Sequence, residues 1–238
     1  MKIINYLFLY LISFTSIVSS VVFAQPSFDA VNSEQRYVYK VSYKKIKVGE
    51  MTREFNIQED AIKVKSSVDL SFLFYHFGGT QLSDLYWDKD SQLFLSRRFV
   101  RKSVGFQGEE VQADFLQAGH QAIVVRNGKT RQFDNKENKI VDFNAISMQI
   151  AEGLKMGQTH FDFYMLSDKK VKHYFFEVKG KDLVMTPLGK FETVRLEQTQ
   201  IKNRKLHIWF APKLNYQMIK FYYKFKLLDL RGIIKHKQ

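Results

Sequence analysis

Alternation of apolar and polar side chains is the feature that most limits what this chain can fold into. From Tyr39 to Lys44 every second residue is apolar, and the residues between them are Lys or Ser. The same period of two recurs in residues 50–57, 62–70, 191–199 and 206–210. A period of two places successive side chains on opposite faces of the backbone, which is typical of a half-buried β-strand. The pattern therefore predicts a mainly β protein.

Turn signals separate these strands at short intervals and predict a meander. We expect turns at residues 47–49, 88–91, 127–128, 168–170, 179–181 and 186–189, of which Asn127-Gly128 is the strongest hairpin signal. A long last strand is expected to place Ile219 and Leu227 on one face and lysines on the other. Large sheets twist and curl, so we predict a single antiparallel, strongly curved sheet or barrel.

One segment departs from the alternation and predicts a short helix near residues 144–155. Asp142 or Asn144 is available as its N-cap, and Gly153 or Gly157 would end it. A single helix beside so many strands is the natural plug or lid for the concave side of the sheet. A cavity between helix and sheet would suit an apolar ligand.

Residues 1–24 have the pattern of a secretory signal peptide. Lys2 precedes an apolar run from Leu7 to Val22, and the small residue Ala24 ends the segment before Gln25. We therefore expect export to the periplasm or to the periplasmic face of the outer membrane, with no transmembrane span left after cleavage. A retained membrane anchor is the alternative. Residues 25–238 are expected to form one domain, and an exported protein is not expected to bind nucleic acid.

Composition narrows the partners further. The chain has no cysteine, which excludes disulfides, thiolate chemistry and the lipid anchor of bacterial lipoproteins, so its 22 Phe, 12 Tyr and 2 Trp must provide the stability. The formal net charge of +13 would attract anionic lipid or glycan. The candidate contacts with such a surface are Lys220, Lys224, Lys226 and Arg231 near the C-terminus. A solvated basic face is the alternative interpretation of these four residues.

Motifs for catalysis or for cofactors are missing from the sequence. The six histidines have no metal-ligand spacing, and no phosphate-binding glycine loop or dinucleotide fingerprint occurs. Acidic pairs such as Glu109-Glu110 are typical of turns, and Asp142 with Ser147 is typical of a helix cap. We therefore expect no catalytic residue, no metal and no cofactor.

Two arginines suggest a ligand site. Arg53 and Arg97 have the parity of the buried face in their strands, and a buried unpaired guanidinium costs several kcal/mol. Each needs a carboxylate, a solvated rim or an anionic ligand. One hypothesis is that they hold the phosphate or carboxylate of an amphipathic ligand, with Tyr39, Phe55 and Trp209 as further contacts. Internal pairing is the alternative.

Several segments together resemble a known family. These are the Tyr-rich first hairpin ending in Gly49, the helix-opening segment 142–147, Thr186-Pro187-Leu188-Gly189-Lys190-Phe191, and Trp209-Phe210-Ala211-Pro212 before a basic last strand. In this order they resemble the DUF3108 family of exported bacterial proteins of undefined function, over about residues 37–223. The resemblance implies an antiparallel β architecture and supplies no catalytic residue.

The leading functional hypothesis is a non-enzymatic periplasmic protein that binds a hydrophobic or amphipathic ligand, either lipid-like or an anionic glycan. The alternative is a filled-core protein that docks an envelope assembly partner through its basic face. An enzyme acting on glycan or lipid is the third possibility. The volume of the interior cavity separates the first two, because an interior without room for an alkyl chain would disfavour a lipid carrier.

Overall fold

The computed structural model describes residues 33–238 apart from 73–74, 106–107 and 168, so the predicted signal peptide lies outside the described residues. The strands are β1 (Ser33–Tyr43), β2 (Ile46–Ile57), β3 (Ile62–Phe72), β4 (Tyr75–Asp88), β5 (Leu93–Val104), β6 (Glu109–Leu116), β7 (Gln121–Arg126), β8 (Lys129–Asp134), β9 (Ile140–Val141), β10 (His160–Leu166), β11 (Val171–Thr186), β12 (Gly189–Thr199), β13 (Arg204–Ala211), β14 (Gln217–Phe225) and β15 (Leu228–Lys237). The α-helix α1 spans Phe143–Lys155, and two short 3-10 turns span Gln117–Gly119 and Pro212–Leu214.

The fifteen strands form one sheet made of two meanders. Strands β1 to β8 follow one another in order, and strands β15 to β9 do the same in reverse. The two meanders join where β1 pairs antiparallel with β15, with Tyr43 opposite Leu230. Neighbouring strands are antiparallel except β9 and β10, which are parallel. The prediction of a single, largely antiparallel sheet is confirmed.

The sheet is curled, because its two edge strands are neighbours in the chain. Residues 135–139 connect β8 directly to β9, and so short a connection reaches no more than about 20 Å. No ladder joins β8 to β9 among the described residues, so the wall is not a closed barrel. A small apolar cluster fills the seam instead, with Ile140 of β9 packed among residues of β6 and β7 such as Val111 and Val124.

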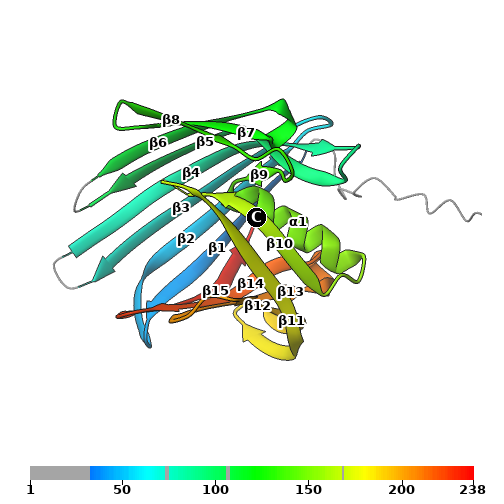
Figure 1. Ribbon diagram of the computed structural model, residues 1–238. Coiled ribbons are helices and arrows are strands. Elements are labelled where there is room, and N and C mark those ends of the chain that lie inside the picture. The colour runs from blue at the N-terminus through cyan, green and yellow to red at the C-terminus, as the bar shows by residue number, and fades with distance from the viewer. Residues whose placement is uncertain (1–32, 73–74, 106–107, 168) are drawn as a thin grey trace, which may run out of the picture.

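Helix α1 fills the concave side of the sheet, between the two meanders (Figure 1). Its side chains Ile146, Ile150 and Leu154 lie in the main hydrophobic core with residues from both meanders. Asp142 is the N-cap, since its carboxylate accepts hydrogen bonds from the backbone N–H groups of Asn144 and Ala145 at 2.6 and 3.1 Å. The predicted helix and its role as a plug agree with this position.

Three turn predictions need correction, and a bulge or a shifted turn explains each. The first hairpin turns at Lys44 and Lys45, not at 47–49, and Gly49 lies in β2 at a bulge. Residues 179–181 do not turn, because β11 continues through a bulge next to Gly180. The expected long last strand is two strands, β14 and β15, which reverse at Lys226 and Leu227.

Arg97 is a further correction. The alternation in β5 predicts that it faces the core, but the residue is exposed. The register between β4 and β5 pairs Asp84 with Arg98 and Leu85 with Ser96, which leaves Arg97 as the extra residue of a bulge. A bulge shifts the parity of the strand by one, so the alternation after it no longer reports burial.

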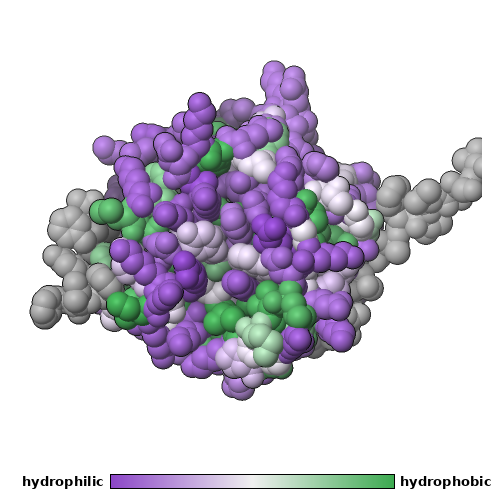
Figure 2. Space-filling model, turned by 90° about the horizontal axis from the view of Figure 1, so that it is seen from below, coloured by the Kyte–Doolittle hydropathy of each residue, from purple (hydrophilic) through white to green (hydrophobic). Residues whose placement is uncertain are grey.

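Outward-facing side chains are mainly charged or polar. Seen from below, the surface is predominantly hydrophilic with separate hydrophobic patches (Figure 2). In the described part of the chain, no helix is both long and apolar enough to cross a bilayer. Along the strands, exposed side chains therefore alternate with buried ones, as a period of two requires.

We predict that Gly49→Ala lowers the free energy of unfolding by about 3 kcal/mol or more. Gly49 has φ +154°, and an added Cβ would lie 2.0 Å from the backbone oxygen of Asp69 on β3. The matched control is Gly128→Ala, at φ +76° with nothing within 4 Å of the added Cβ, which should cost about 1 to 2 kcal/mol. Urea unfolding of both variants measures the difference, and equal midpoints would contradict the predicted close approach of β2 and β3.

Candidate functional site

The first half of α1 carries a buried polar cluster that the strands beneath it help to build. Ser66 of β3 donates a hydrogen bond to Asn144 Oδ1 at 3.1 Å, and Asn144 Nδ2 donates to Ser83 Oγ of β4 at 2.9 Å. The backbone N–H of Asp142 donates to Ser96 Oγ of β5 at 3.2 Å. Three adjacent strands thus each place one serine at the start of the helix. This arrangement fixes α1 on the sheet by hydrogen bonds rather than by apolar packing alone.

Gln149, one turn further along α1, continues the polar anchoring. Its side-chain oxygen accepts a hydrogen bond from the backbone N–H of Phe94 at 2.8 Å. This contact satisfies a backbone donor of β5 that faces the helix. Asn144 and Gln149 are both buried, so their side chains are tied to the sheet and are not available to a ligand.

Arg53 of β2 lies against the same helix and is only 4% exposed. Its Nη2 donates a hydrogen bond to Ser147 Oγ of α1 at 2.7 Å, and its guanidinium lies 4.9 Å from the centre of the Phe55 ring. Arg53 Nε is buried and has no hydrogen-bond partner, and within the described ranges no carboxylate oxygen lies within 4 Å of the guanidinium. Burial lowers the pKa of Arg53, whereas Tyr39, Tyr37 and Asp142 favour its charged form. The cation is therefore only partly compensated.

Tyr39 and Phe55, which the sequence places with Arg53, do lie near it. Tyr39 is fully buried, donates from its hydroxyl to the backbone oxygen of Met218 at 2.7 Å, and accepts from Gln217 Nε2 at 2.8 Å. Burial raises the pKa of Tyr39, so it stays neutral. Phe55 packs edge-on against Tyr37 with ring centres 5.9 Å apart.

The remaining two candidates, Arg97 and Trp209, lie elsewhere. Arg97 lies over the Tyr86 ring at 4.6 Å and 3.8 Å from an Asp84 carboxylate oxygen, in solvent. Trp209 donates from Nε1 to Asp182 at 2.6 Å and is covered by the Lys220 ammonium at 4.2 Å. Neither residue lines the cavity at Arg53.

A cavity of about 90 Å³ opens beside Arg53, between β1, β2, α1 and residues 215–218. Arg53, Phe55 and Ser147 form part of its lining, with Glu152 and Lys155 contributed by the last turns of α1. Pockets for drug-sized ligands measure about 300 to 1,000 Å³, so this cavity admits a small group or a few waters and not an alkyl chain. A second cavity, of about 150 Å³, lies between α1 and strands β5, β9 and β10, and it is also smaller than a pocket for a drug-sized ligand.

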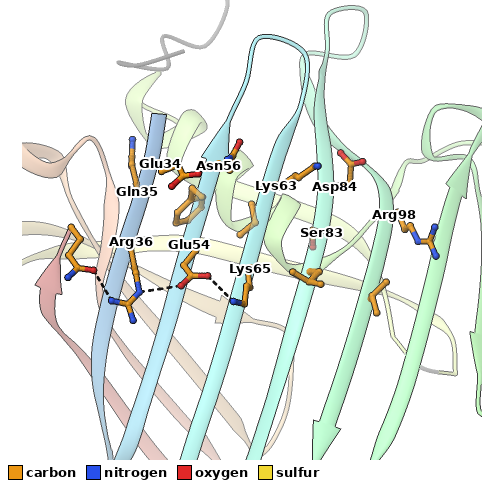
Figure 3. A pocket seen from close by; sticks show the side chains of 15 residues that line it. Glu34, Gln35, Arg36, Glu54, Asn56, Lys63, Lys65, Ser83, Asp84 and Arg98 are labelled. Carbon is orange, nitrogen blue, oxygen red and sulfur yellow. Dashed lines mark hydrogen bonds and ion pairs between the residues drawn. The ribbon is translucent and has the colours of Figure 1, made fainter. Parts of the chain in front are cut away.

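A larger recess, of about 830 Å³, lies on the outer face of β1–β5 (Figure 3). Arg36 donates to Glu54 at 3.2 Å and to Gln238 at 2.8 Å, and Lys65 lies 3.2 Å from the other Glu54 oxygen. Figure 3 shows these side chains in one row across the strands. Over the whole lining, the four basic residues Arg36, Lys63, Lys65 and Arg98 nearly balance the three acidic residues Glu34, Glu54 and Asp84, so the recess presents little unbalanced charge to a ligand.

The four basic residues near the C-terminus have different surroundings. Lys220 is half-buried against Trp209, and burial lowers its pKa. Arg231 stacks over the Tyr222 ring at 5.3 Å and lies 3.6 Å from Asp229. Lys224 and Lys226 are exposed, and neither has a carboxylate within 4 Å among the residues that the structure describes. Arg231 is exposed as well, but it is paired with Asp229.

Acidic pairs serve local structure. Glu109 bonds both Arg101 and Arg126, and Asp88 accepts a hydrogen bond from the backbone N–H of Ser91 in a turn. Over the described ranges, no group of three or more His, Asp or Glu side chains is placed to hold a metal ion.

Comparison with protein families identifies the chain's relatives. Residues 38–229 match the family model described as "Protein of unknown function (DUF3108)".

The chain belongs to the DUF3108 family. The fold of this DUF3108 protein is similar to a β-barrel-like protein of the domain of unknown function DUF1849 from Brucella abortus, with a TM-score of 0.61 and 11% identity over 88% of this chain and 98% of that chain. A "putative lipoprotein" from Parabacteroides distasonis aligns with a TM-score of 0.31 and 10% identity, over 87% of this chain and 97% of that chain. The comparison with curated proteins gave no match.

The serines that anchor α1 in this DUF3108 protein were not identified from the sequence. Ser66 and Ser83 have the parity of the buried face in β3 and β4, where an apolar residue is expected, whereas Ser96 has the opposite parity to Arg97 and is buried next to the bulge in β5. Small polar residues at inward positions of two consecutive strands are therefore the signal that could have revealed a polar contact to the helix.

We predict that Asp142→Asn makes this DUF3108 protein more stable than the wild type at neutral pH but not at low pH. Burial raises the pKa of Asp142 above its ordinary value of 3.8, and hydrogen bonds oppose that rise only in part. The folded state then holds the proton more tightly than the unfolded state, so wild-type stability falls as pH rises through and above that value. An Asn side chain can still cap α1 and does not ionise.

Thermal unfolding of both proteins at a series of pH values measures this effect. The stability difference between Asp142→Asn and wild type should grow from acid to neutral pH. A constant difference would show that the Asp142 carboxyl has the same pKa in the folded and unfolded states.

Proposed function

We propose that this protein is a non-enzymatic binding protein of the cell envelope, exported through its N-terminal segment, that recognises the anionic group of an amphipathic or glycan ligand through Arg53. The observation that supports the proposal is a nine-tenths buried arginine without a carboxylate partner in the described ranges, at the wall of a cavity. A buried cation that lacks a counter-charge costs several kcal/mol, and an anion in the cavity would offset that cost.

Arginine suits this task by its shape. Its planar guanidinium carries several donors in fixed geometry and binds carboxylate or phosphate through paired hydrogen bonds. In Arg53, Nη2 already bonds Ser147, so the serine holds the guanidinium in place beside the cavity. The Phe55 ring beneath it supports the same orientation.

The small cavity limits what the ligand can place inside. About 90 Å³ accommodates a group the size of a carboxylate or phosphate, so a ligand tail would lie outside the cavity and not in the core. A carrier that buries an entire acyl chain in its interior is therefore disfavoured. Lys155, 3.1 Å from Glu152 at the cavity wall, forms a charged pair near the entering group.

A docking protein is the second candidate, and one observation favours it. Lys224 and Lys226 are exposed without a carboxylate partner in the described part of the chain, which leaves positive charge free for an anionic envelope partner. This candidate needs no ligand at Arg53, so the two are separable by experiment.

We predict that the wild-type protein, purified from a bacterial envelope, carries an anionic small molecule detectable by native mass spectrometry and organic extraction. Arg53→Met, which keeps side-chain length without charge, should weaken retention about 10- to 100-fold, the loss of one or two charge-assisted hydrogen bonds. Arg53→Lys should retain an intermediate amount.

Arg97→Met is the matched control, because it removes an exposed arginine outside the cavity and should leave retention unchanged. Circular dichroism of each variant checks the fold. A bare wild-type mass, with a folded protein, would remove the ligand proposal and favour the docking protein.

A further inference from the structure

Two hairpin tips lie side by side at one end of the sheet, independently of the cavity at Arg53. They belong to the β1–β2 hairpin and the β14–β15 hairpin, whose strands β1 and β15 pair directly. The backbone N–H of Lys44 donates to the Asp229 oxygen at 2.8 Å, and the Tyr43 hydroxyl donates to the Leu227 oxygen at 3.0 Å. Figure 1 shows both tips, one blue and one red, together at the lower left. We call residues 43–47 and 224–228 the tip surface.

Apolar side chains project from this tip surface into solvent. Leu227 is 87% exposed, Ile46 is 65% exposed and Leu228 is 49% exposed. Leu227 lies in the tight turn after Lys226, whose φ is +52°. Turns of this kind favour Gly, Asn or Asp, so local folding gives no reason for leucine there. Grouped exposed apolar residues indicate an interaction site.

Positive charge surrounds these apolar side chains. The tip surface contains five lysines and no acidic residue. Lys47 lies 3.6 Å from Glu50, but Lys44, Lys45, Lys224 and Lys226 have no carboxylate within 4 Å in the ranges that the structure describes. Two of these lysines lie over neighbouring rings, Lys44 over Tyr43 and Lys226 over Phe225, with their ammonium groups still exposed.

We infer that the tip surface docks on a leaflet rich in anionic phospholipid. Leucine and isoleucine side chains would enter the boundary between head groups and acyl chains, while the lysines beside them contact lipid phosphates. An anionic glycan would bind the lysines but leave three large apolar side chains in water, so it fits the surface less well. Val104, 63% exposed and paired with Gly78, lies at the same end of the sheet on β5.

Lipid binding by such a surface has two separable contributions. Each lysine near an anionic leaflet strengthens binding about fivefold at moderate salt, and this part weakens as salt is added. Apolar insertion does not depend on salt in the same way. Both contributions are required, because a single weak anchor holds a protein only marginally on a membrane.

The test is co-sedimentation of the folded protein with vesicles of phosphatidylcholine alone and with vesicles that also contain phosphatidylglycerol. We expect binding to the anionic vesicles and little to the neutral ones, with a decline as salt rises. Lys224→Gln with Lys226→Gln should weaken binding about 25-fold. Ile46→Ser with Leu227→Ser should reduce binding at every salt concentration, including high salt where the lysines contribute least.

Matched controls lie on another hairpin, β11–β12. Leu183→Ser with Met185→Ser removes apolar side chains that are 56% and 65% exposed, and Lys181→Gln with Lys190→Gln removes two exposed lysines. Both control pairs should leave vesicle binding unchanged. All eight altered residues, four lysines and four apolar residues, are exposed, so the variants should fold.

Equal loss of binding in the tip and control variants would show non-specific attraction by the net charge and would overturn the inference. Absence of binding to anionic vesicles would overturn it as well. Binding of the wild type to an immobilised anionic glycan, with no dependence on Ile46 and Leu227, would assign the lysines to a polysaccharide instead. Because none of these residues lines the cavity, failure here leaves the proposal for Arg53 intact.

Discussion

The pairing of β1 with β15 is the contact on which the rest of the structure depends. It joins residues 37–43 to residues 230–237 and so turns two meanders into one sheet. In sequence, these two segments are separated by nearly the whole described chain. Tyr39 strengthens the join, since its hydroxyl bonds residues 217 and 218 in the neighbouring strand β14. Because so much chain must be ordered before this contact forms, it has a high entropic cost and should form late in folding. Only after it forms is there a concave side for α1 to fill.

The sequence predicted the type of each main element but not the β-bulges, at which the alternation of buried and exposed side chains shifts by one residue. Arg53 and Arg97 show the difference. Both have inward parity, yet Arg53 is buried and Arg97 is exposed, because a bulge after Asp84 shifts the register of β5. Bulges depend on how two strands pair, which one strand's pattern does not contain. The same limit applies to Gly49, a turn signal that belongs instead to a bulge in β2.

Only those residues of the candidate site whose burial follows from the alternation of side chains along a strand could be predicted from the sequence. Arg53, Phe55 and Tyr39 share a region because neighbouring strands place alternate residues on one face. The polar anchor of α1 was missed, because it needs the helix to lie across β3, β4 and β5 at one height. Strand order and helix position come from long-range packing, which no local pattern specifies. The surroundings of Trp209 could not be predicted for the same reason, since its partner Asp182 lies on β11, 27 residues earlier in the chain.

The cavity at Arg53 and the tip surface lie at opposite ends of β1. Gln35 at the start of the strand lines the cavity, and Tyr43 at its end belongs to the tip surface. Gln35 and Tyr43 are separated by eight residues, or about 26 Å of extended chain. If the tips rest on a leaflet, the cavity lies at the end of β1 that is farther from that leaflet. An anionic ligand would then reach Arg53 from the aqueous side, and a lipid would have to leave the membrane first. The two proposals together therefore favour a soluble or partly soluble ligand, such as a glycan end group, over a phospholipid taken directly from the supporting leaflet.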